Sequence, residues 1–397
     1  MKNKVLTIFT LGLLSAIGPF SIDMYLPSFP AIADDFNTSI SHIGLSLSSF
    51  FIGISVGQLI YGPLLDRFGR KKPLYVGLIL YLIASILCAY SVDANMLILL
   101  RFFQALGSCV GMVAARALIR DLFPVEENAK IFSFTMLVIA VSPIVAPTAG
   151  GYITLHFGWK TIFLVLAAIS FIILLAVYFW LPAGNKPNKE MSLLPKPIIT
   201  QFLAALKVPQ FYTYVLVSGV SASGLYAYIA GSPLVFMGIF EVTEEQYGWI
   251  FAFLALGMVA SNLINTLLLK KFTSEQITMT AQTAQVIIGF VLMTGTIFNW
   301  FGLYETIFLI WIFLCTQGFI FPNSSALAMA PFTRTAGTAS ALMGAIQLGI
   351  GAVATALVSA LSKTTAIPMT SVMFASGALA YIIYFIGNHF LKEISLD

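Results

Sequence analysis

Charged residues are scarce in this sequence, and that scarcity decides which class of protein it can be. Lys, Arg, Asp and Glu make up 9% of the 397 residues, whereas a soluble domain carries roughly 25%. So few charges cannot cover the surface of a water-soluble globule, and the mean hydropathy of +0.95 agrees. The sequence therefore predicts an integral membrane protein.

Patterns that bind metals, nucleotides or reactive substrates are missing as well. The three cysteines, Cys88, Cys109 and Cys315, each lie within an apolar run. They lack the spacing of a disulfide framework or a metal site, so we interpret them as small core residues. The sequence contains no phosphate-binding glycine loop and no nucleophile cluster. We therefore expect no enzymatic activity, no cofactor and no metal, and we expect an ion gradient to supply the energy.

Long apolar runs are what the sequence has in abundance. About 20 apolar residues let an α-helix cross ~30 Å of hydrocarbon, and the runs are continuous rather than alternating as in transmembrane β-strands. We therefore predict an all-α integral membrane protein. Its twelve predicted transmembrane helices cover residues 5–26, 43–65, 74–91, 96–118, 131–155, 161–181, 211–236, 247–269, 277–298, 305–329, 337–361 and 369–391.

The basic residues fall on one side of this predicted topology. With both termini in the cytoplasm, all of the 20 Lys and Arg residues except Arg101, Lys160 and Lys363 lie in cytoplasmic segments, as the positive-inside rule expects. The acidic residues on the outer side are Asp34, Asp35, Asp93, Glu241, Glu244 and Glu245. This bias accounts for the net charge of +4, so we expect no nucleic-acid partner.

The longest polar segment divides the chain into two halves. It follows the sixth predicted span and carries several Pro and Lys residues. We predict an N-terminal six-helix bundle at 1–182, a cytoplasmic linker at 183–207 and a C-terminal six-helix bundle at 208–397. Two bundles joined by a linker are typical of transporters built from repeated halves.

The charged loop between the second and third spans carries the clearest motif. Its sequence, Gly-Pro-Leu-Leu-Asp-Arg-Phe-Gly-Arg-Lys-Lys at 62–72, resembles the G-x-L-x-D-R-x-G-R-[RK] loop of the major facilitator superfamily. Residues 101–107 of span four resemble that superfamily's R-x-x-Q-G-x-G element, with Ala105 in place of a glycine. Residues 143–151 are similar to the G-x-x-x-G-P-x-x-G-G element of its antiporters, with Ala146 in place of a glycine.

Four more segments narrow the resemblance. Residues 23–27, 115–121, 228–233 and 337–342 resemble the bicyclomycin/chloramphenicol-resistance (Bcr/CflA) drug:proton antiporters. The resemblance implies a major facilitator fold in a bacterial cytoplasmic (inner) membrane. It also implies a monomer that exchanges protons for small hydrophobic or weakly polar drugs, of the amphenicol or bicyclomycin kind, by alternating access. The partners are then a drug substrate, protons and the lipid bilayer.

Asp23 and Arg101 are the two ionisable residues that the topology places deepest in hydrocarbon. A charge there is costly and is a functional candidate by default. Span one nears the outer surface at Asp23, and span four leaves that surface at Arg101, so the two lie at similar depth and an ion pair between them is possible. We predict that they couple transport to protons. A structural role, as a staple of the bundle or a cap of the helix end, stays open for Asp23.

A second charged group lies on the predicted cytoplasmic face. The resemblance implies that Asp66 faces the N-terminus of a helix in the other half, where the helix dipole favours a carboxylate. It also implies that Arg70 bridges to an acid near the end of span four, for which Asp121 is well placed. The predicted cytoplasmic latch comprises Gly62, Asp66, Gly69, Arg70, Arg116 and Asp121. The other basic residues of the loop are interpreted as topological anchors.

Span five combines prolines with small residues. Proline removes a backbone hydrogen bond within a helix, and small residues let neighbouring helices pack closely. We predict an antiporter-type helix that seals the two halves against leak, with a plain kinked packing helix as the alternative. Its residues are Pro143, Pro147, Gly150 and Gly151.

Uncharged polar residues complete the predicted site. An aromatic, mostly neutral cavity suits a hydrophobic or weakly polar ligand, although helix packing is an alternative role for each residue. The predicted cavity residues are Tyr25, Gln104, Tyr226, Tyr228, Gln317, Asn323 and Gln347.

Two other functions are weighed against drug export. An uptake permease would use Asp23 to couple import of a small metabolite, and Ala146 leaves that reading open. A membrane sensor or scaffold on the same fold is disfavoured, because it has no need for both a latch and buried charges.

Overall fold

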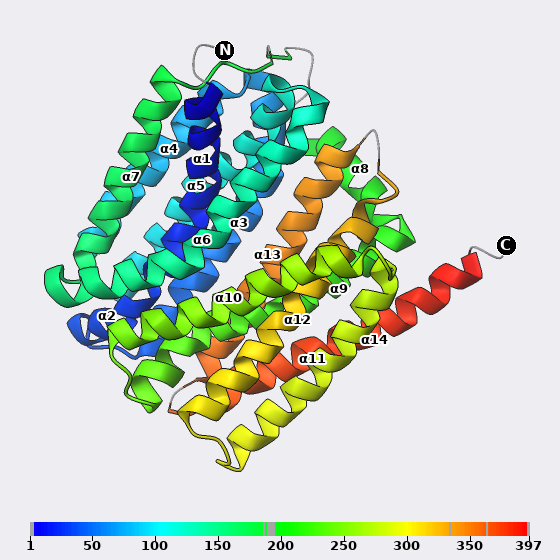
Figure 1. The fold of residues 1–397 in the computed structure, drawn as a ribbon. Coiled ribbons are helices and arrows are strands. Elements are labelled where there is room, and N and C mark those ends of the chain that lie inside the picture. The colour runs from blue at the N-terminus through cyan, green and yellow to red at the C-terminus, as the bar shows by residue number, and fades with distance from the viewer. Residues whose placement is uncertain (1–3, 186, 189–194, 333–334, 363, 395–397) are drawn as a thin grey trace.

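The chain forms two bundles of helices that meet at one end and separate at the other (Figure 1). This computed structural model describes residues 4–185, 187–188, 195–332, 335–362 and 364–394. Within them, twelve helices are long and apolar enough to span a membrane, which confirms the twelve predicted spans and the all-α fold class. Lys2, Lys186, Lys189, Arg334 and Lys363, which entered the predicted charge bias, lie outside the described residues.

The N-terminal half contains seven α-helices and one short 3-10 helix. These are α1 (Lys4–Asp23), η1 (Leu26–Ser28), α2 (Phe29–Asp35), α3 (Ile40–Phe68), α4 (Lys71–Ala89), α5 (Ala94–Leu122), α6 (Val125–Phe157) and α7 (Trp159–Phe179). The helix α8 (Pro195–Leu206) follows, and then the C-terminal half. That half contains α9 (Pro209–Ser232), the π-helix η2 (Pro233–Ile239), α10 (Glu244–Leu268), α11 (Ser274–Ile297), α12 (Leu303–Met329), α13 (Ala336–Leu361) and α14 (Ile367–Ile394).

Local sequence fixes several helix ends. Asp93 caps α5 by accepting a hydrogen bond from the Met96 amide, which satisfies one of the orphan N–H groups of the first turn. Thr243 and Thr273 begin α10 and α11 with reciprocal capping boxes. Gly69 ends α3 at φ +80°, a conformation that glycine adopts at no steric cost. Gly69 therefore makes the turn between α3 and α4.

Three short elements were not predicted. α2 follows the first span, η2 extends the seventh span, and α8 lies within the predicted linker. Leu26, predicted as the end of span one, lies in η1, because α1 ends at Asp23. α8 leaves Ile199 and Leu203 exposed on one face, as an amphipathic helix at a membrane surface does.

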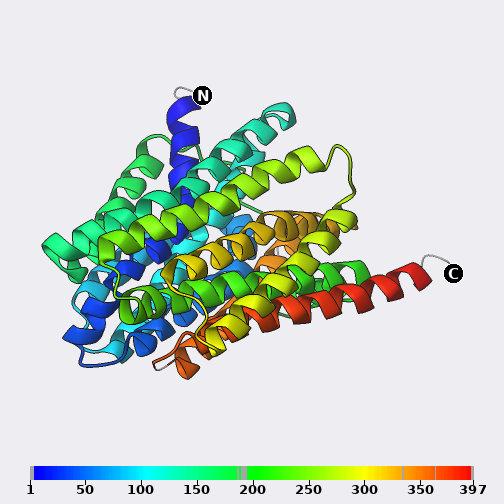
Figure 2. The same ribbon diagram turned by 60° about the horizontal axis from the view of Figure 1, so that its bottom comes forward.

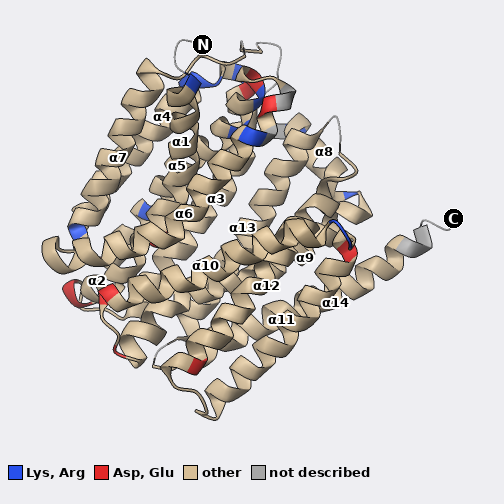
Figure 3. Cartoon of the chain, viewed as in Figure 1, with Lys and Arg blue, Asp and Glu red and all other residues tan. Residues whose placement is uncertain are grey.

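The two ends of the molecule differ in charge. Lys and Arg gather at the end where the chain begins, which we term the basic end, and Asp and Glu gather around α2, at what we term the acidic end (Figure 3). Asp34 and Asp35 belong to α2 itself.

The halves contact each other along α3 and α13 and along α6 and α10. Ser48 and Thr355 share a hydrogen bond of 2.8 Å between their hydroxyl oxygens, and the Ser55 hydroxyl donates to the Ala345 carbonyl at 2.7 Å. The rotated view shows the helices of the C-terminal half crossing those of the N-terminal half at this joint (Figure 2). The joint is nearer the acidic end, and the chain is open toward the basic end.

Candidate functional site

Asp23 lies at the last position of α1 and is buried, with 6% of its surface exposed. Its Oδ2 accepts one hydrogen bond, from the Ser142 hydroxyl on α6, at 3.2 Å. The C-terminal end of a helix carries a partial negative charge, so α1 itself opposes a carboxylate at this position. Judged by exposure of the whole residue, Asp23 and Arg101 are the only buried charged residues in the described chain.

Arg101 is fully buried in the N-terminal bundle, where aromatic rings surround it. Its guanidinium carbon lies 4.6 Å from the ring centroid of Tyr25 and 4.2 Å from that of Phe50, in cation–π geometry. Nη1 donates to Gln104 Oε1 at 2.5 Å, and Nη2 donates to the Ser21 carbonyl at 3.0 Å. Because Ser21 is in the last turn of α1, its carbonyl belongs to those without an intrahelical partner.

The ion pair considered between Asp23 and Arg101 is absent from the described structure. Asp23 contacts Ser142, whereas Arg101 is held by Gln104 and by the backbone at Ser21. The physical reason is that the Ser21 carbonyl of α1 and the surrounding aromatic rings already stabilise much of the positive charge on the Arg101 guanidinium. The pair that the topology made possible is not formed in this conformation, although Asp23 and the Ser21 acceptor of Arg101 share the last turn of α1.

The C-terminal bundle contains a neutral counterpart of this cluster. Gln317 on α12 donates from Nε2 to the Ser221 carbonyl of α9 at 2.7 Å. The Ser221 hydroxyl donates to Gln285 Oε1 at 2.9 Å, and Gln282 Nε2 donates to the same oxygen at 3.2 Å. Sequence reasoning missed Gln282 and Gln285. Their i, i+3 spacing inside an apolar helix was the signal that could have found them.

The contacts predicted for the loop between α3 and α4 are partly present. Arg70 Nε donates to Asp121 Oδ2 at 2.7 Å, and Arg70 also pairs with Asp66. Burial acts to lower the pKa of the Arg70 guanidinium, but its hydrogen bonds and charge interactions with Asp121 and Asp66 raise that pKa above its usual value. Arg70 therefore stays charged.

Other latch predictions are not met in this conformation. Asp66, with its side chain 48% exposed, makes no described ion pair or side-chain hydrogen bond with the C-terminal half. A Cβ added at Gly62 would meet no atom within 4 Å, so Gly62 is not at a close approach. Arg116 joins neither acid of the latch in an ion pair that the structure describes. The opening between the halves at the basic end accounts for the departures at Asp66 and Gly62, whereas Arg116 lies in the same half as both acids and Asp121 is already bonded to Arg70 and Asn185.

That opening is a cleft of about 800 Å³. Residues from the latch line one side, and the first turns of α13 and α8 line the other, including Gly337, Thr338 and Gln201. Gln58 marks its inner limit, since the Gln58 side chain lies against Gly344 of α13. Beyond this point toward the acidic end, α3 and α13 are in contact.

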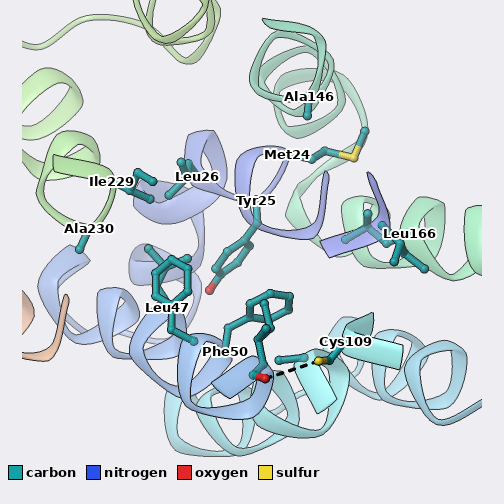
Figure 4. Packing of buried hydrophobic residues seen from close by; sticks show 14 of the residues in the cluster. Met24, Tyr25, Leu26, Leu47, Phe50, Cys109, Ala146, Leu166, Ile229 and Ala230 are labelled. Carbon is teal, nitrogen blue, oxygen red and sulfur yellow. Dashed lines mark hydrogen bonds between the residues drawn. The ribbon is translucent and has the colours of Figure 1, made fainter. Parts of the chain in front are cut away.

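The antiporter-type helix lies at the joint of the halves. A Cβ on Gly150 would overlap the Met24 carbonyl, and one on Gly151 would lie 2.7 Å from the Glu244 carbonyl of α10. Figure 4 shows Ala146 beside Met24, and shows Leu26 and Ile229 approaching each other from the two halves. Ala146 is fully buried, so the small side chain suffices at a position where the related element has glycine. Pro143 and Pro147 both lie within the continuous helix α6.

The predicted cavity residues do not line the cleft. Tyr25 and Gln104 belong to the Arg101 cluster, and Gln317 belongs to the amide cluster. Tyr226 packs on Phe51 across the joint, with ring centroids 4.7 Å apart, and Tyr228 is buried against Phe251.

The last two predicted cavity residues make hydrogen bonds within the C-terminal bundle. Asn323 donates to Asn265 Oδ1 at 2.7 Å, and Gln347 donates to the Ser218 hydroxyl at 2.8 Å. Helix packing is thus the role that this conformation gives to most of the seven residues.

Comparison with known proteins settles the family. The sequence model of the Major Facilitator Superfamily matches residues 11–356. The chain belongs to the major facilitator superfamily. Members of this superfamily are transporters and not enzymes, so the twelve helices form a multi-pass membrane transporter of small molecules.

Relatives agree with this assignment. The protein called Uncharacterized MFS-type transporter YdgK of Bacillus subtilis (strain 168) is 34% identical over 387 residues, which cover 97% of this chain and 96% of the relative. The Bicyclomycin resistance protein homolog of Haemophilus influenzae is 30% identical over 384 residues, 97% of this chain and 96% of the relative. These names agree with a major facilitator protein of the Bcr/CflA type.

A solved structure shows the same fold. The crystal structure of D-xylose-proton symporter matches with a TM-score of 0.73 at 17% sequence identity, covering 95% of this chain and 97% of that one. The two six-helix bundles are therefore those of the major facilitator fold.

Proposed function

We propose that this protein is a proton-driven exporter of small hydrophobic or weakly polar drugs that works by alternating access. The observation that carries the proposal is Asp23, a carboxyl buried at the joint of the two halves without a cation partner in the described structure. An intramembrane carboxyl of this kind is costly to leave charged. It is therefore suited to bind a proton in one conformation and release it in another.

Arg101 fits a supporting part in this cycle. It holds the Ser21 carbonyl two residues before Asp23, so a change at Asp23 that moves the end of α1 also moves an acceptor of Arg101. The Tyr228 and Tyr247 side chains of the C-terminal half lie near Asp23. Protonation of Asp23 would thus act on both the N-terminal bundle and the joint.

Alternating access requires the joint to open as the cleft closes. We propose that the bundles 1–182 and 208–397 move about the linker 183–207, with the basic end in the cytoplasm, as the positive-inside rule favours. On closure, Asp66 would approach the N-terminus of α13, where a helix dipole favours a carboxylate. The Arg70 contacts with Asp66 and Asp121 would hold the loop in position for this approach.

The substrate class rests on two supports. A relative of 30% identity is named for bicyclomycin resistance. The buried polar residues of the described C-terminal bundle are uncharged amides and hydroxyls. A neutral interior suits uncharged or weakly polar cargo.

Transport in proteoliposomes with an imposed pH gradient tests the proposal. With radiolabelled chloramphenicol as the probe, the wild-type protein should move drug against proton flow, and Asp23→Asn should abolish proton-coupled movement. Asp34→Asn is the matched control, because it removes an exposed carboxylate at the same end. Proton-coupled export that survives Asp23→Asn would refute the carrier assignment. Accumulation of the probe along the proton gradient would identify an uptake permease instead.

A further inference from the structure

The cleft at the basic end has an uneven distribution of charge. Three arginines line it, Arg70, Arg116 and Arg120, together with two carboxylates, Asp66 and Asp121. Arg70 pairs with both carboxylates. The positive charge that remains therefore belongs to Arg116 and Arg120.

These two arginines have no partner in the described part of the chain. Neither forms an ion pair or a hydrogen bond there, and their guanidinium groups repel each other one turn apart on α5. The Asp121 carboxylate is already occupied. Asn185 donates to both of its oxygens, at 2.7 and 3.2 Å, and Arg70 donates to it as well. Arg116 is half-buried within a membrane-spanning helix, where an unpaired charge is costly.

The opposite wall supplies no compensating acid. Among its described residues, Gln201, Thr338 and Ser340 contribute neutral polar groups, and Phe202 and Pro197 contribute apolar surface. If the cleft closed without a ligand, the guanidinium groups of Arg116 and Arg120 would lose contact with water and would face only neutral groups. A cleft lined by excess charge of one sign attracts ions of the other sign.

We propose that Arg116 and Arg120 bind an anionic substituent, a carboxylate or phosphate, on an amphiphilic cargo molecule that enters the cleft. The guanidinium fork suits the bidentate geometry of these groups, and Phe202 and Pro197 offer surface to the apolar part of the molecule. If Arg116 and Arg120 only fixed the orientation of the chain in the membrane, they would not need to line the cleft. The assignment rests on the proposed export function and extends its cargo from neutral drugs to amphiphilic molecules that carry one anionic group, but binding itself can be measured without transport.

A matched pair of probes tests the site. Chloramphenicol is neutral, and chloramphenicol succinate adds one carboxylate. We expect the purified protein in phosphatidylcholine nanodiscs to bind the succinate ester about tenfold more tightly than chloramphenicol. The Arg116→Gln/Arg120→Gln double variant should lose this difference. Inorganic phosphate should compete with the ester on the wild-type protein.

Two variants serve as controls. Arg67→Gln removes a positive charge from the same end but not from the cleft lining, so it should keep the tenfold preference. Arg116→Lys keeps the charge and should retain part of the preference, which separates a charge effect from misfolding of the double variant.

Three results would overturn the assignment. Equal affinity for the two probes would do so, and so would a preference that persists in the double variant. The third is displacement of the ester by phosphatidylglycerol added to the nanodisc, without competition by phosphate, which would identify a lipid headgroup as the occupant. Failure of the proposed export function would look different, since the binding preference would persist while proton-coupled transport was absent.

Discussion

The two bundles make the same contact with different chemistry. In the N-terminal bundle, Arg101 on α5 donates to the Ser21 carbonyl of α1 at 3.0 Å. In the C-terminal bundle, Gln317 on α12 donates to the Ser221 carbonyl of α9 at 2.7 Å. Each contact ties the fourth long helix of a bundle to its first. One donor carries a full charge, and the other is a neutral amide.

This difference bears on why Arg101 is charged. Because an amide makes the equivalent tie in the C-terminal bundle, the tie does not require a cation. A buried cation costs desolvation energy that a neutral amide avoids. The tie between the two helices therefore does not explain why Arg101 is charged, and this supports the proposed coupling role of Arg101 over a purely structural one.

The largest expected effect comes from replacing the two donors, Arg101 and Gln317, by alanine, because the loss of stability then compares the two contacts directly. Arg101→Ala should lower the free energy of unfolding by about 4 kcal/mol, because it leaves the Gln104 and Ser21 acceptors unpaired and opens a cavity among aromatic rings. Gln317→Ala should cost about 2 kcal/mol. Denaturant unfolding in detergent, followed by intrinsic fluorescence, measures both. Equal costs would remove the distinction between the bundles.

Arg101→Gln replaces the charged donor of the N-terminal bundle by a neutral amide, the type of donor that Gln317 provides in the C-terminal bundle. This variant should fold, with a smaller loss of stability than Arg101→Ala, but should lose proton-coupled transport. Retained coupling would show that the charge is dispensable.

The next effect concerns the joint of the bundles. Gly151→Ala places a methyl group 2.7 Å from the Glu244 carbonyl, so backbone must shift and the cost should be about 2 kcal/mol. Gly62→Ala is the control, since its methyl group would meet no atom within 4 Å, and it should raise stability by up to about 1 kcal/mol because alanine favours the helix more than glycine does. Cysteine-accessibility labelling at the acidic end should increase for Gly151→Ala alone.

The loop between α3 and α4 offers a comparison of two acids within one bundle. The Asp121 side chain is 6% exposed and that of Asp66 is 48% exposed. Asp121→Asn should destabilise the protein by about 2 kcal/mol, and Asp66→Asn by less than about 1 kcal/mol, because solvent screens the exposed pair. Unfolding midpoints at neutral pH test this order, and a larger cost for Asp66→Asn would contradict it.

The smallest effect is expected at a single hydrogen bond between the halves. Ser48→Ala and Thr355→Ala should each cost about 1 kcal/mol, and the double variant should cost less than their sum because both remove the same 2.8 Å contact. A double-mutant cycle measures this coupling. Additive costs would mean that the hydroxyls act independently.

Sequence predicted the fold class, the twelve spans and the Arg70–Asp121 contact, because hydrophobic length and short charged motifs are local signals. It did not predict the partners of Asp23 and Arg101. Ser142 is distant in sequence from its partner Asp23, and Ser21 is distant from its partner Arg101. Neither serine lies in a pattern that marks it. The π-helix η2 and the helix α8 were missed because tertiary contacts and the position beside the cleft, rather than periodicity alone, define them.

The predicted substrate cavity stays a prediction. Tyr226, Asn323 and Gln347 are polar residues within apolar helices, but in this conformation they bond or pack within the protein. A sequence does not state which conformation is populated, and a polar residue that faces a cavity in one state can face a neighbour in another. The residues that do line the cleft, such as Arg116 and Gln58, lie nearer the basic end.

The joint and the cleft differ in one more respect. Hydroxyls, aromatic rings and backbone atoms close the acidic end at Ser48, Tyr226 and Gly151, whereas five charged side chains line the open cleft. Dissolved salt screens charges over roughly 8 Å at physiological ionic strength, but it leaves neutral contacts almost unchanged. Ionic strength therefore acts on the cleft and spares the joint, so, with the basic end in the cytoplasm as proposed, the salt content of that compartment would set how long the cleft stays open.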